Sequence, residues 1–589
     1  AGLQTIGANA FNACSELGPI VIPSTVTEIG DGAFNMFKSD PVYSSKQVIV
    51  KLTSITFAES KDGTVTPLKL GKEVFSWNNA LTSITLREGV TNVPSKAFYR
   101  CKVLESVTVP TTVTNDNNNG LRAIGESAFE DCEALNEISF TAGGDKPLSF
   151  AKNAFKNCKL LTKLDLPARI SGFNGSYDVF EFGDGVTKNP NAIMAFGENP
   201  DNFVKDGVAT AYPIAEYNVI ENGGEFTSYD NVLYTADKKT VIACPFGKTG
   251  KVTLAKEATS FRSCAFYGCQ YVTEISFEDG GLEPFVMKDN TNFNNSVGKT
   301  EAVFYACPRL TSISFPSRLK SIGSYALYSG SGNSGIGSTT TGLTIEFAEN
   351  SELEEIGDFA FHSLKSLKEF TLPANVSAIG KTVFNGCTNL KTLNLPADTT
   401  AETLSSIVQG ATALTTVNIN EANNEIVNDN GVILNKGRTF IAYVLPGSKS
   451  KLTSYNVPAT VTKIGDNAFL NAKALKSLTF LTAEEGEEKP LEIGKYAFSA
   501  TGITEVTLPK RIKNFGAYAF YNCKSLATLK FENGFSASIP DYAFQNSILT
   551  EVTIPGDVVA MGRSAFSGTN LTTVTFGLTA SGAASQLKR

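Results

Sequence analysis

Apolar and polar positions follow one recurring order along the chain. Counted from Phe361, apolar residues fall at +3, +6, +9, +11, +15 and +18, proline at +12, glycine at +19, and the next phenylalanine, Phe384, at +23. The segment Leu-x-x-Leu-x-Leu-Pro, as in "LKTLNLP" and "LTKLDLP", alternates apolar and polar residues and predicts a short strand with one buried face. Proline ends the strand, because it has no N–H group to donate to a neighbouring strand.

Two other segments complete the repeated unit. Val-x-x-Ile-Gly predicts a change of chain direction in which glycine allows a tight backbone. Ala-Phe-x-x-Cys predicts a short helical or 3-10 turn whose phenylalanine fills the core. A unit of about 23 residues cannot bury its own apolar face, so successive units must stack. The anchor positions of the units are Phe11, Phe34, Phe75, Phe98, Phe129, Phe155, Phe266, Phe304, Leu327, Phe361, Phe384, Phe469, Phe498, Phe520, Phe544 and Phe566.

The repeated segments Ile-Gly-x-x-Ala-Phe-x-x-Cys and Leu-x-x-Leu-x-Leu-Pro resemble the BspA-type leucine-rich repeat of bacterial surface proteins. The resemblance covers nearly the whole chain. It implies a repeat solenoid with one short parallel β-strand per unit, and short helical or 3-10 turns, or secondary strands, on the opposite side. It also implies a secreted or surface-anchored adhesin that contacts host matrix proteins or other cells.

Some segments depart from the repeat. "YDNVLYTADKKTVIACPFGK" from Tyr229 and "IVNDNGVILNKGRTFIAYVLPGSK" from Ile426 each predict a projecting β-hairpin insertion. The repeat pattern is weak in 173–213 and 397–411. We expect one continuous solenoid made of a repeat block at 1–172, an irregular segment at 173–228, a hairpin with repeats at 229–396, a degenerate segment at 397–425, and a hairpin with repeats at 426–589. Because the first unit lacks its strand, we expect the chain to be a fragment of a longer protein.

Composition narrows the classes of partner. The chain is 42% hydrophobic and 19% charged, which is typical of a globular protein. Its net charge of −7 argues against a nucleic-acid surface and against docking on anionic lipid. No run of about 18 apolar residues occurs, so we expect no membrane insertion by this region. The sequence shows neither a signal peptide nor an anchor, and the expected extracellular or cell-surface location rests on the family resemblance.

Eight of the ten cysteines share position +3 after the anchor: Cys14, Cys101, Cys132, Cys158, Cys269, Cys307, Cys387 and Cys523. One interpretation is a metal or disulfide array, and the other is a small buried residue inside the turn. Cys101, Cys132 and Cys158 lie in three successive units and cannot all pair. No C-x-x-C pair has zinc-type spacing. We therefore predict free thiols.

Candidate catalytic residues are few. His362 is the single histidine, so it cannot form a multi-histidine metal site, and no nucleophile stands at a recognisable spacing. We expect it at the surface. Residues 330–335 match G-x-G-x-x-G but lack the flanking strand and helix of a dinucleotide site, which favours a plain loop. Glu274, Glu369, Glu505 and Glu551 occupy scattered outward strand positions and do not form an acid–base pair.

We therefore predict no catalytic, cofactor or metal site. The Asn- and Asp-rich segments 114–120 and 289–295 offer oxygen ligands for Ca²⁺, but they lack the full calcium-loop pattern and its later glutamate. Two alternatives to an adhesin stay open. One is a β-solenoid enzyme acting on polysaccharide, and the other is a passive spacer that displays another domain.

A polar row remains as the candidate contact surface. Position +10, outward and central on each strand, is threonine in eight of fourteen units. Such a row offers a regular hydroxyl array to ice, glycan or protein, although threonine also favours strands and solubility. A protein partner is expected, since repeat surfaces give broad, shallow contact, while a glycan partner stays open. The predicted contact residues are Thr85, Thr108, Lys368, Glu369, Thr371, Thr479, Thr507 and Thr553.

Overall fold

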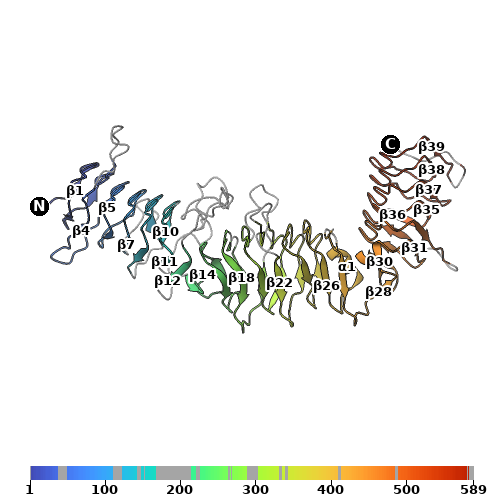
Figure 1. Cartoon of the computed structure of the whole chain (residues 1–589), viewed down its shortest axis with the longest axis horizontal. Helices are drawn as coiled ribbons and strands as arrows, with labels where there is room; N and C mark the ends of the chain where they lie inside the picture. The colour runs from blue at the N-terminus through green and yellow to red at the C-terminus, as the bar shows by residue number, and fades with distance from the viewer. Residues whose placement is uncertain are drawn as a thin grey trace. The chain divides into compact units, whose positions relative to one another are not determined.

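The structure, a computed structural model, describes residues 2–37, 50–110, 122–141, 148–151, 153–166, 214–220, 226–262, 265–266, 268–287, 303–329, 335–338, 342–408, 411, 413–483, 489–579 and 582. The chain divides into two compact units. Unit 1 comprises Ala1–Arg318 and Ala326–Leu343, and unit 2 comprises Leu319–Tyr325 and Thr344–Arg589. Within each unit the chain winds in successive coils that stack on one another (Figure 1).

Each coil contributes one strand from the leucine-rich segment, and these strands form what we call the A row. In β35, Glu505 and Thr507 are exposed while Val506 and Leu508 are buried, as the alternating pattern predicts. The A row of unit 1 contains β2 (Ile20–Ile22), β4 (Ile55–Phe57), β6 (Ser83–Thr85), β7 (Ser106–Val109), β9 (Glu137–Phe140), β11 (Lys163–Leu166), β12 (Glu216–Val219), β16 (Gly250–Leu254), β18 (Val272–Phe277) and β20 (Ser312–Phe315). The A row of unit 2 contains β22 (Thr344–Phe347), β24 (Glu369–Thr371), β26 (Thr392–Leu395), β27 (Thr416–Ile419), β31 (Ser454–Val457), β33 (Ser477–Phe480), β35 (Glu505–Leu508), β37 (Thr528–Phe531), β38 (Glu551–Ile554) and β39 (Thr573–Phe576).

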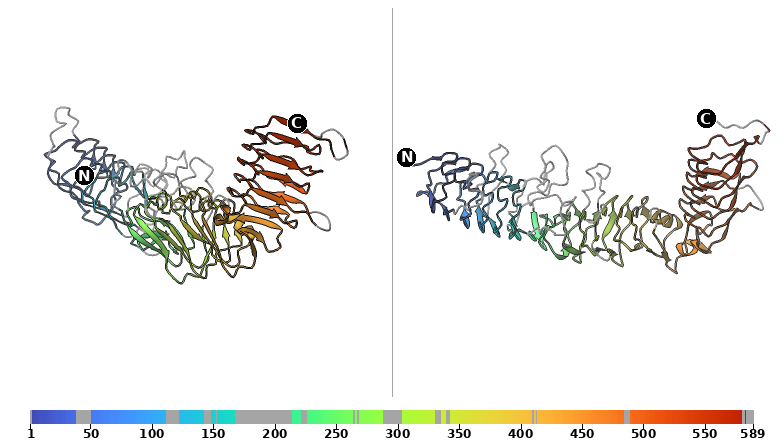
Figure 2. Two further views of the ribbon diagram at one scale, coloured as in Figure 1. Left: turned by 45° about the vertical axis from the view of Figure 1, so that its right-hand side comes forward. Right: turned by 45° about the horizontal axis from the view of Figure 1, so that its top comes forward.

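A second series of shorter strands, the B row, comes in most coils from segments that end in an apolar residue followed by glycine, usually Ile-Gly. These strands also pair in parallel, as Glu28 does with Lys69. The B row of unit 1 contains β1 (Thr5–Ile6), β3 (Glu28–Ile29), β5 (Lys69–Leu70), β8 (Arg122–Ile124), β10 (Leu148–Phe150), β17 (Ser260–Phe261) and β19 (Phe285–Met287). The B row of unit 2 contains β21 (Leu319–Ile322), β23 (Glu355–Ile356), β25 (Ala378–Ile379), β32 (Lys463–Ile464), β34 (Leu491–Ile493) and β36 (Ile512–Phe515). Figure 2 shows the strands of successive coils side by side in the orange and red part of unit 2.

The Ala-Phe-x-x-Cys segments form hydrogen-bonded turns that are neither α-helical nor 3-10, which differs from the sequence prediction. In the turn around Phe98, the N–H groups of Lys96, Phe98 and Arg100 donate to carbonyl oxygens of the next coil at 2.8, 2.7 and 2.9 Å. The N–H groups between them donate to carbonyl oxygens three residues earlier in their own coil. This alternation requires left-handed backbone at Lys96 (φ 55°) and Arg100 (φ 60°), which a continuous helix does not contain.

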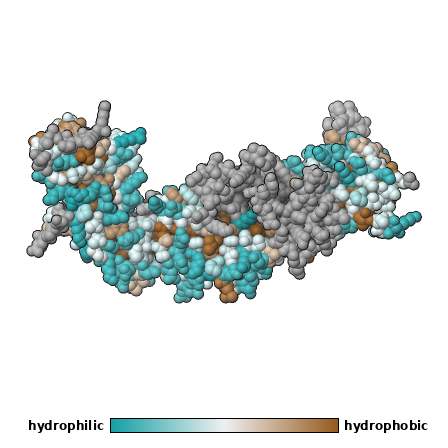
Figure 3. Space-filling view, turned by 180° about the vertical axis from the view of Figure 1, so that it is seen from behind, coloured by the Kyte–Doolittle hydropathy of each residue, from teal (hydrophilic) through white to brown (hydrophobic). Residues whose placement is uncertain are grey.

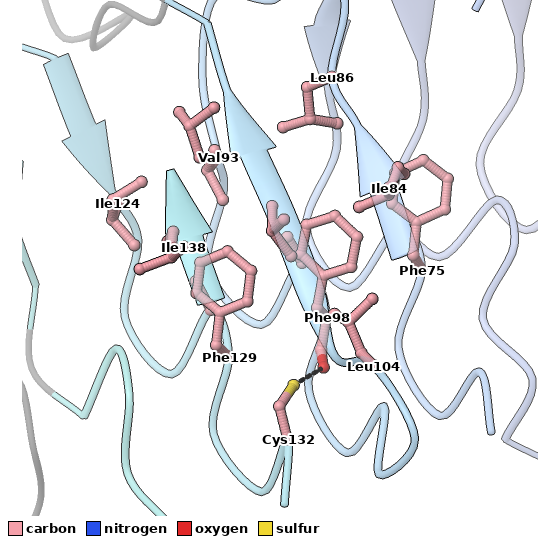
Figure 4. Packing of buried hydrophobic residues seen from close by; sticks show 14 of the residues in the cluster. Phe75, Ile84, Leu86, Val93, Phe98, Leu104, Ile124, Phe129, Cys132 and Ile138 are labelled. Carbon is pink, nitrogen blue, oxygen red and sulfur yellow. Dashed lines mark hydrogen bonds between the residues drawn. The ribbon is translucent and has the colours of Figure 1, made fainter. Parts of the chain in front are cut away.

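The anchor phenylalanines form a stack through the core of neighbouring coils. Ring centroids lie 5.4 Å apart for Phe75 and Phe98 and 5.2 Å apart for Phe98 and Phe129, and all three side chains are buried (Figure 4). The same stacking continues in unit 2, where the centroids of Phe498 and Phe520 are 5.0 Å apart. Stacked aromatic pairs contribute about 0.5–1.5 kcal/mol beyond the apolar area that they bury. The repeated phenylalanine therefore holds each coil in register with the next.

The glycine of Ile-Gly is required by the closeness of adjacent coils rather than by unusual dihedral angles. A Cβ atom on Gly494 would lie 2.6 Å from the backbone nitrogen of Asp466 in the preceding coil. At Gly125 the corresponding contact, with Ser95, would be 2.5 Å. Any side chain at this position forces neighbouring coils apart, so the glycine sets the spacing of the stack.

The two hairpin segments are three-stranded and join the B row, so they are not separate projecting insertions. In unit 1, β14 pairs antiparallel with both neighbours, and the third strand then pairs in parallel with β17. In unit 2 the third strand likewise pairs in parallel with β32. The strands are β13 (Phe226–Tyr229), β14 (Val232–Thr235) and β15 (Thr240–Ala243) in unit 1, and β28 (Ile426–Asp429), β29 (Val432–Asn435) and β30 (Phe440–Val444) in unit 2.

Two α-helices occur in the described residues, α1 (Ala401–Val408) and α2 (Pro446–Lys449). Thr400 begins α1, since its Oγ1 accepts a hydrogen bond from the N–H of Thr403 at 3.1 Å. The side chains of Leu404 and Ile407 are buried, in a coil that has no anchor phenylalanine. Neither helix in the described part of the chain has the length and apolarity to cross a bilayer.

Candidate functional site

The predicted contact residues lie at the outward-facing side of the A row. Seven of them are exposed, and Thr108 is half-buried. Thr85 and Thr108 face each other as register partners on β6 and β7. In unit 2, Thr479 and Thr507 lie on the paired strands β33 and β35. The structure thus brings the predicted residues together in local groups along each A row.

Hydroxyl groups of neighbouring coils bond to one another in unit 1. The register continues from Thr108 to Ser139, whose Oγ donates to Thr108 Oγ1 at 3.1 Å. Two coils further on, Asn218 Nδ2 donates to Asp165 Oδ1 at 2.7 Å. Because these side chains bond along the stack, the row presents fixed donors and acceptors at these coils.

A groove of about 620 Å³ opens on this face between β4 and β6. Thr56 and Thr85 lie in its wall with Ser83, and the buried apolar residues of the same strands close its base. The loop of residues 59–65 forms another side, where Val65 is 58% exposed. Concave sites with mixed apolar and polar lining are the usual places for ligand contact.

The loop beside the groove is held by its own hydrogen bonds. Asp62 Oδ1 accepts from Ser60 Oγ at 2.5 Å, from Thr64 Oγ1 at 2.7 Å and from the Thr64 N–H at 3.1 Å. These bonds to the carboxylate, the one from Ser60 foremost, lower the pKa of Asp62 to about 2. The Asp62 carboxylate therefore stays ionised at physiological pH, and its hydrogen bonds to Ser60 and Thr64 hold the loop that forms this side of the groove.

The charged residues of the groove are partly engaged by the protein itself. Arg87 Nη2 donates to the carbonyl oxygen of Val26 at 2.9 Å, and burial lowers the pKa of this guanidinium. Glu88 Oε1 accepts from Thr141 Oγ1 at 3.1 Å. Glu59 lies on the loop side and is exposed. The groove thus combines hydroxyl, carboxylate and apolar surface.

In unit 2 the contact row is an amide and hydroxyl ladder. Asn394 Nδ2 donates to Glu369 Oε1 at 2.6 Å and to Thr371 Oγ1 at 3.1 Å. Asn418 Nδ2 in turn donates to Asn394 Oδ1 at 2.8 Å. Sequence reasoning missed Asn418, because its coil contains α1 and has no anchor phenylalanine from which to count.

One face of the molecule is mainly polar where its residues are described (Figure 3). Figure 3 shows one face of the molecule on which hydrophilic residues dominate and hydrophobic ones are scattered.

Three tyrosines stack on one another on the turns of unit 2. The ring centroids of Tyr496 and Tyr518 are 4.6 Å apart, and those of Tyr518 and Tyr542 are 4.5 Å apart. Their ring faces cover one another, so the middle ring offers no free face to a sugar.

Cysteines at position +3 form hydrogen bonds between neighbouring coils. The Cys132 thiol donates to the carbonyl oxygen of Phe98 in the preceding coil at 3.1 Å (Figure 4), and Cys101 and Cys387 do the same to Phe75 and Phe361 at 3.1 and 3.0 Å. Burial raises the pKa of Cys101 and of Cys387 to about 12, so both stay protonated. The nine described cysteines are free thiols. Eight of them are buried and fit a structural role, and Cys14 is exposed.

The other candidate residues stay apart or lie inside the turns. His362 is half-buried, not a plain surface residue, since its ring lies 5.8 Å from that of Phe359 and its Nδ1 lies 2.6 Å from Ser363 Oγ. Burial lowers the pKa of His362. The outward glutamates occupy separate A-row strands. The described residues contain no group of three His, Cys, Asp or Glu side chains placed to hold a metal ion. Segments 114–120, 289–295 and 330–334 lie outside the described residues.

Comparisons with known proteins agree with this architecture. The family model described as "BspA type Leucine rich repeat region (6 copies)" matches residues 1–115, 115–177, 246–336, 300–430 and 447–572. No curated protein matches the chain.

Solved structures of bacterial leucine-rich repeat proteins are also similar. One from Eubacterium ventriosum is 19% identical with a TM-score of 0.37, and the match covers 58% of this chain and 93% of that one. The pneumococcal vaccine antigen PcpA is 17% identical with a TM-score of 0.28, covering 90% and 85%. A leucine-rich cell surface protein from Faecalibacterium prausnitzii is 15% identical with a TM-score of 0.31, covering 65% and 93%. With the family model matching most of its length, the chain belongs to the BspA-type leucine-rich repeat family.

Proposed function

We propose that this chain is a non-catalytic bacterial cell-surface protein that binds host matrix proteins or other cells through the outward face of its A rows. The observation that carries the proposal is the exposed polar row itself, with the groove between β4 and β6 at its side. Membership in the BspA-type family supports a surface location, since one similar solved structure is described as a cell surface protein. Repeat proteins commonly bind partners on such extended surfaces.

The geometry of the face favours binding over chemistry. Some of its polar side chains are fixed by hydrogen bonds to the adjacent coil, as at Asn394 and Asn418. Fixed donors and acceptors lose little conformational entropy when a partner binds, which favours a broad interface of modest contacts. We therefore expect several coils to contribute to one partner contact.

The test is a binding screen with the full chain. Fibronectin, laminin, fibrinogen and collagen are immobilised, and binding is measured by biolayer interferometry. The variants T85R/T108R and T507R/T553R place bulky side chains on the A rows, while T5R/A378R places them at exposed B-row positions. Loss of binding in an A-row variant, with binding kept by T5R/A378R, supports the proposal. No binding to any matrix protein, or equal binding by all variants, overturns it.

A further inference from the structure

Three exposed lysines meet on two neighbouring coils of unit 2, at the edge where the turn leads into the A row. Lys368 and Lys391 are on adjacent coils, because the Lys391 N–H donates to the Lys368 carbonyl oxygen at 2.8 Å. Lys365 lies in the same coil as Lys368, and its carbonyl oxygen accepts from Asn389 Nδ2 of the next coil at 2.9 Å. We call these three residues the lysine edge.

The ammonium groups of the lysine edge have no carboxylate partner within 4.0 Å among the described residues. The nearest acidic residue in the sequence, Glu369, accepts the amide of Asn394 instead, at 2.6 Å. Three positive charges therefore face solvent beside the polar row.

The equivalent edge of unit 1 shows that this arrangement is not a general property of the repeat. Lys365 stands at +4 from its anchor, and at the same position of three successive unit 1 coils stand Lys102, Glu133 and Lys159. There the Glu133 carboxylate pairs with Lys102 at 3.0 Å and with Lys159 at 2.6 Å. The lysines of unit 1 are neutralised by a carboxylate on the coil between them, whereas those of the lysine edge are not.

The same two positions carry exposed lysines again further along unit 2. Lys473 and Lys476 stand at +4 and +7 from Phe469, as Lys365 and Lys368 do from Phe361. Repetition at fixed positions on stacked coils places positive charge along the direction of stacking. A linear polymer with anions along its length matches the lysine edge, because it can meet the charges of two adjacent coils at once.

We propose that the lysine edge binds a linear anionic polysaccharide, of the sulfated or uronic-acid-containing kind found on host cells and in their matrix. The inference rests on the proposed binding role and names one class of partner for it. Exposed ammonium groups bind sulfate and carboxylate as point charges and need no deep pocket. The hydroxyl and amide groups of the adjoining A row are placed to accept and donate hydrogen bonds to sugar hydroxyls.

The experiment measures binding of the full chain to immobilised heparin and hyaluronan at about 0.15 M salt, where long-range attraction is screened. The variant K365Q/K368Q/K391Q removes the lysine edge. The control K102Q/K159Q/K163Q removes three lysines that are ion-paired within unit 1, so the change in net charge is the same. Far-ultraviolet circular dichroism verifies that both variants fold.

We expect the lysine-edge variant to bind about tenfold more weakly than the wild type and the control to stay within about twofold. Binding to heparin alone would show that the lysine edge requires sulfate groups. Binding to both polymers would show that carboxylate groups are sufficient, and either result supports the proposal. Absence of binding, equal loss in both variants, or equally strong competition by double-stranded DNA overturns it. The lysine-edge variant is also tested on the immobilised matrix proteins, because it leaves the threonines of the A rows unchanged: kept matrix-protein binding with weakened polysaccharide binding separates this result from the matrix-protein proposal.

Discussion

Asn78 occupies the position that cysteine fills in the neighbouring coils, and replacing it with cysteine should stabilise the protein. Its side chain is fully buried, and neither Nδ2 nor Oδ1 has a hydrogen-bond partner among the described residues. In the next coils, Cys101 and Cys132 donate to the carbonyl oxygen of the preceding anchor phenylalanine at 3.1 Å. The variant N78C removes the unsatisfied amide and supplies a donor for the corresponding oxygen of Phe34.

The magnitude follows from the two changes. A buried polar group without a partner costs about 1–3 kcal/mol, and a weak thiol donor returns only part of a normal hydrogen bond. The smaller side chain leaves a little space, which offsets some of the gain. We therefore expect N78C to raise the free energy of unfolding by about 1–2 kcal/mol.

The assay is urea denaturation with a fluorescence readout from Trp77, the adjacent residue and the single tryptophan of the chain. The midpoint should move to higher urea in N78C with an unchanged slope. The reciprocal variant C101N places an amide in the neighbouring coil and should lower stability by about 1–3 kcal/mol, while C101S, which keeps a donor, should lie between C101N and wild type. A midpoint for N78C at or below that of the wild type, together with a neutral C101N, would refute the reasoning.

Further outcomes follow from the same structure. G494A should destabilise the protein by about 2 kcal/mol or more, because the added Cβ would meet the backbone of the preceding coil. G447A should be close to neutral, because a Cβ there would have no neighbouring atom within 4 Å, and thermal unfolding compares the two variants. Burial lowers the pKa of Lys449 from 10.5 to about 8, so between these values only the unfolded chain binds this proton and the contribution of Lys449 to stability rises with pH. K449M should therefore be more stable than the wild type by about 1–2 kcal/mol at pH 7 and lose this advantage by pH 10.5; urea titrations of both proteins at pH 7, 9 and 10.5 measure the difference, and a difference that does not change with pH would contradict the assignment. In a C264S background, a thiol reagent should modify Cys14 quickly and the buried cysteines only after unfolding; fast modification of a second thiol would contradict the stacked turns.

The core of the fold can be predicted from sequence because it depends on a period. A phenylalanine recurring about every 23 residues must occupy the same place in each coil, and Phe498 and Phe520 stack as that logic requires. The alternation of Glu505 and Thr507 with buried neighbours likewise follows from strand geometry.

The turns and the second row of strands were less accessible to sequence reasoning. Lys96 and Arg100 adopt left-handed backbone because alternate N–H groups bond to the next coil, and this depends on a neighbour that no local pattern specifies. The glycine of Ile-Gly was expected to serve a tight turn, yet the contact at Gly494 shows that close packing between coils requires it. Helix α1 had a readable signal in Thr400, Leu404 and Ile407, which are spaced for a capped amphipathic helix.

The sequence predicted the polar residues of the A row, but it did not predict the groove and the unpaired lysines beside them. Thr85 and Thr108 were expected on one face and are register partners. The groove beside Thr85 depends on a loop inserted after β4, whose shape comes from hydrogen bonds to Asp62. Of the lysine edge, the sequence predicted only Lys368 as a contact residue. The absence of carboxylate partners depends on which side chains the neighbouring coils bring close, so it is seen only in the folded structure. The contact role of the row itself stays a prediction.

The most direct test of the proposed contact face is site-specific photo-crosslinking to a matrix protein that the full chain binds. A photoreactive phenylalanine derivative is placed at Thr85 or Thr507 on the A rows, and at Thr5 or Ala378 on the B rows, all of which are exposed. The proposed contact face predicts crosslinked complexes from at least one A-row position and from neither B-row position. Crosslinks confined to the B-row positions would contradict it.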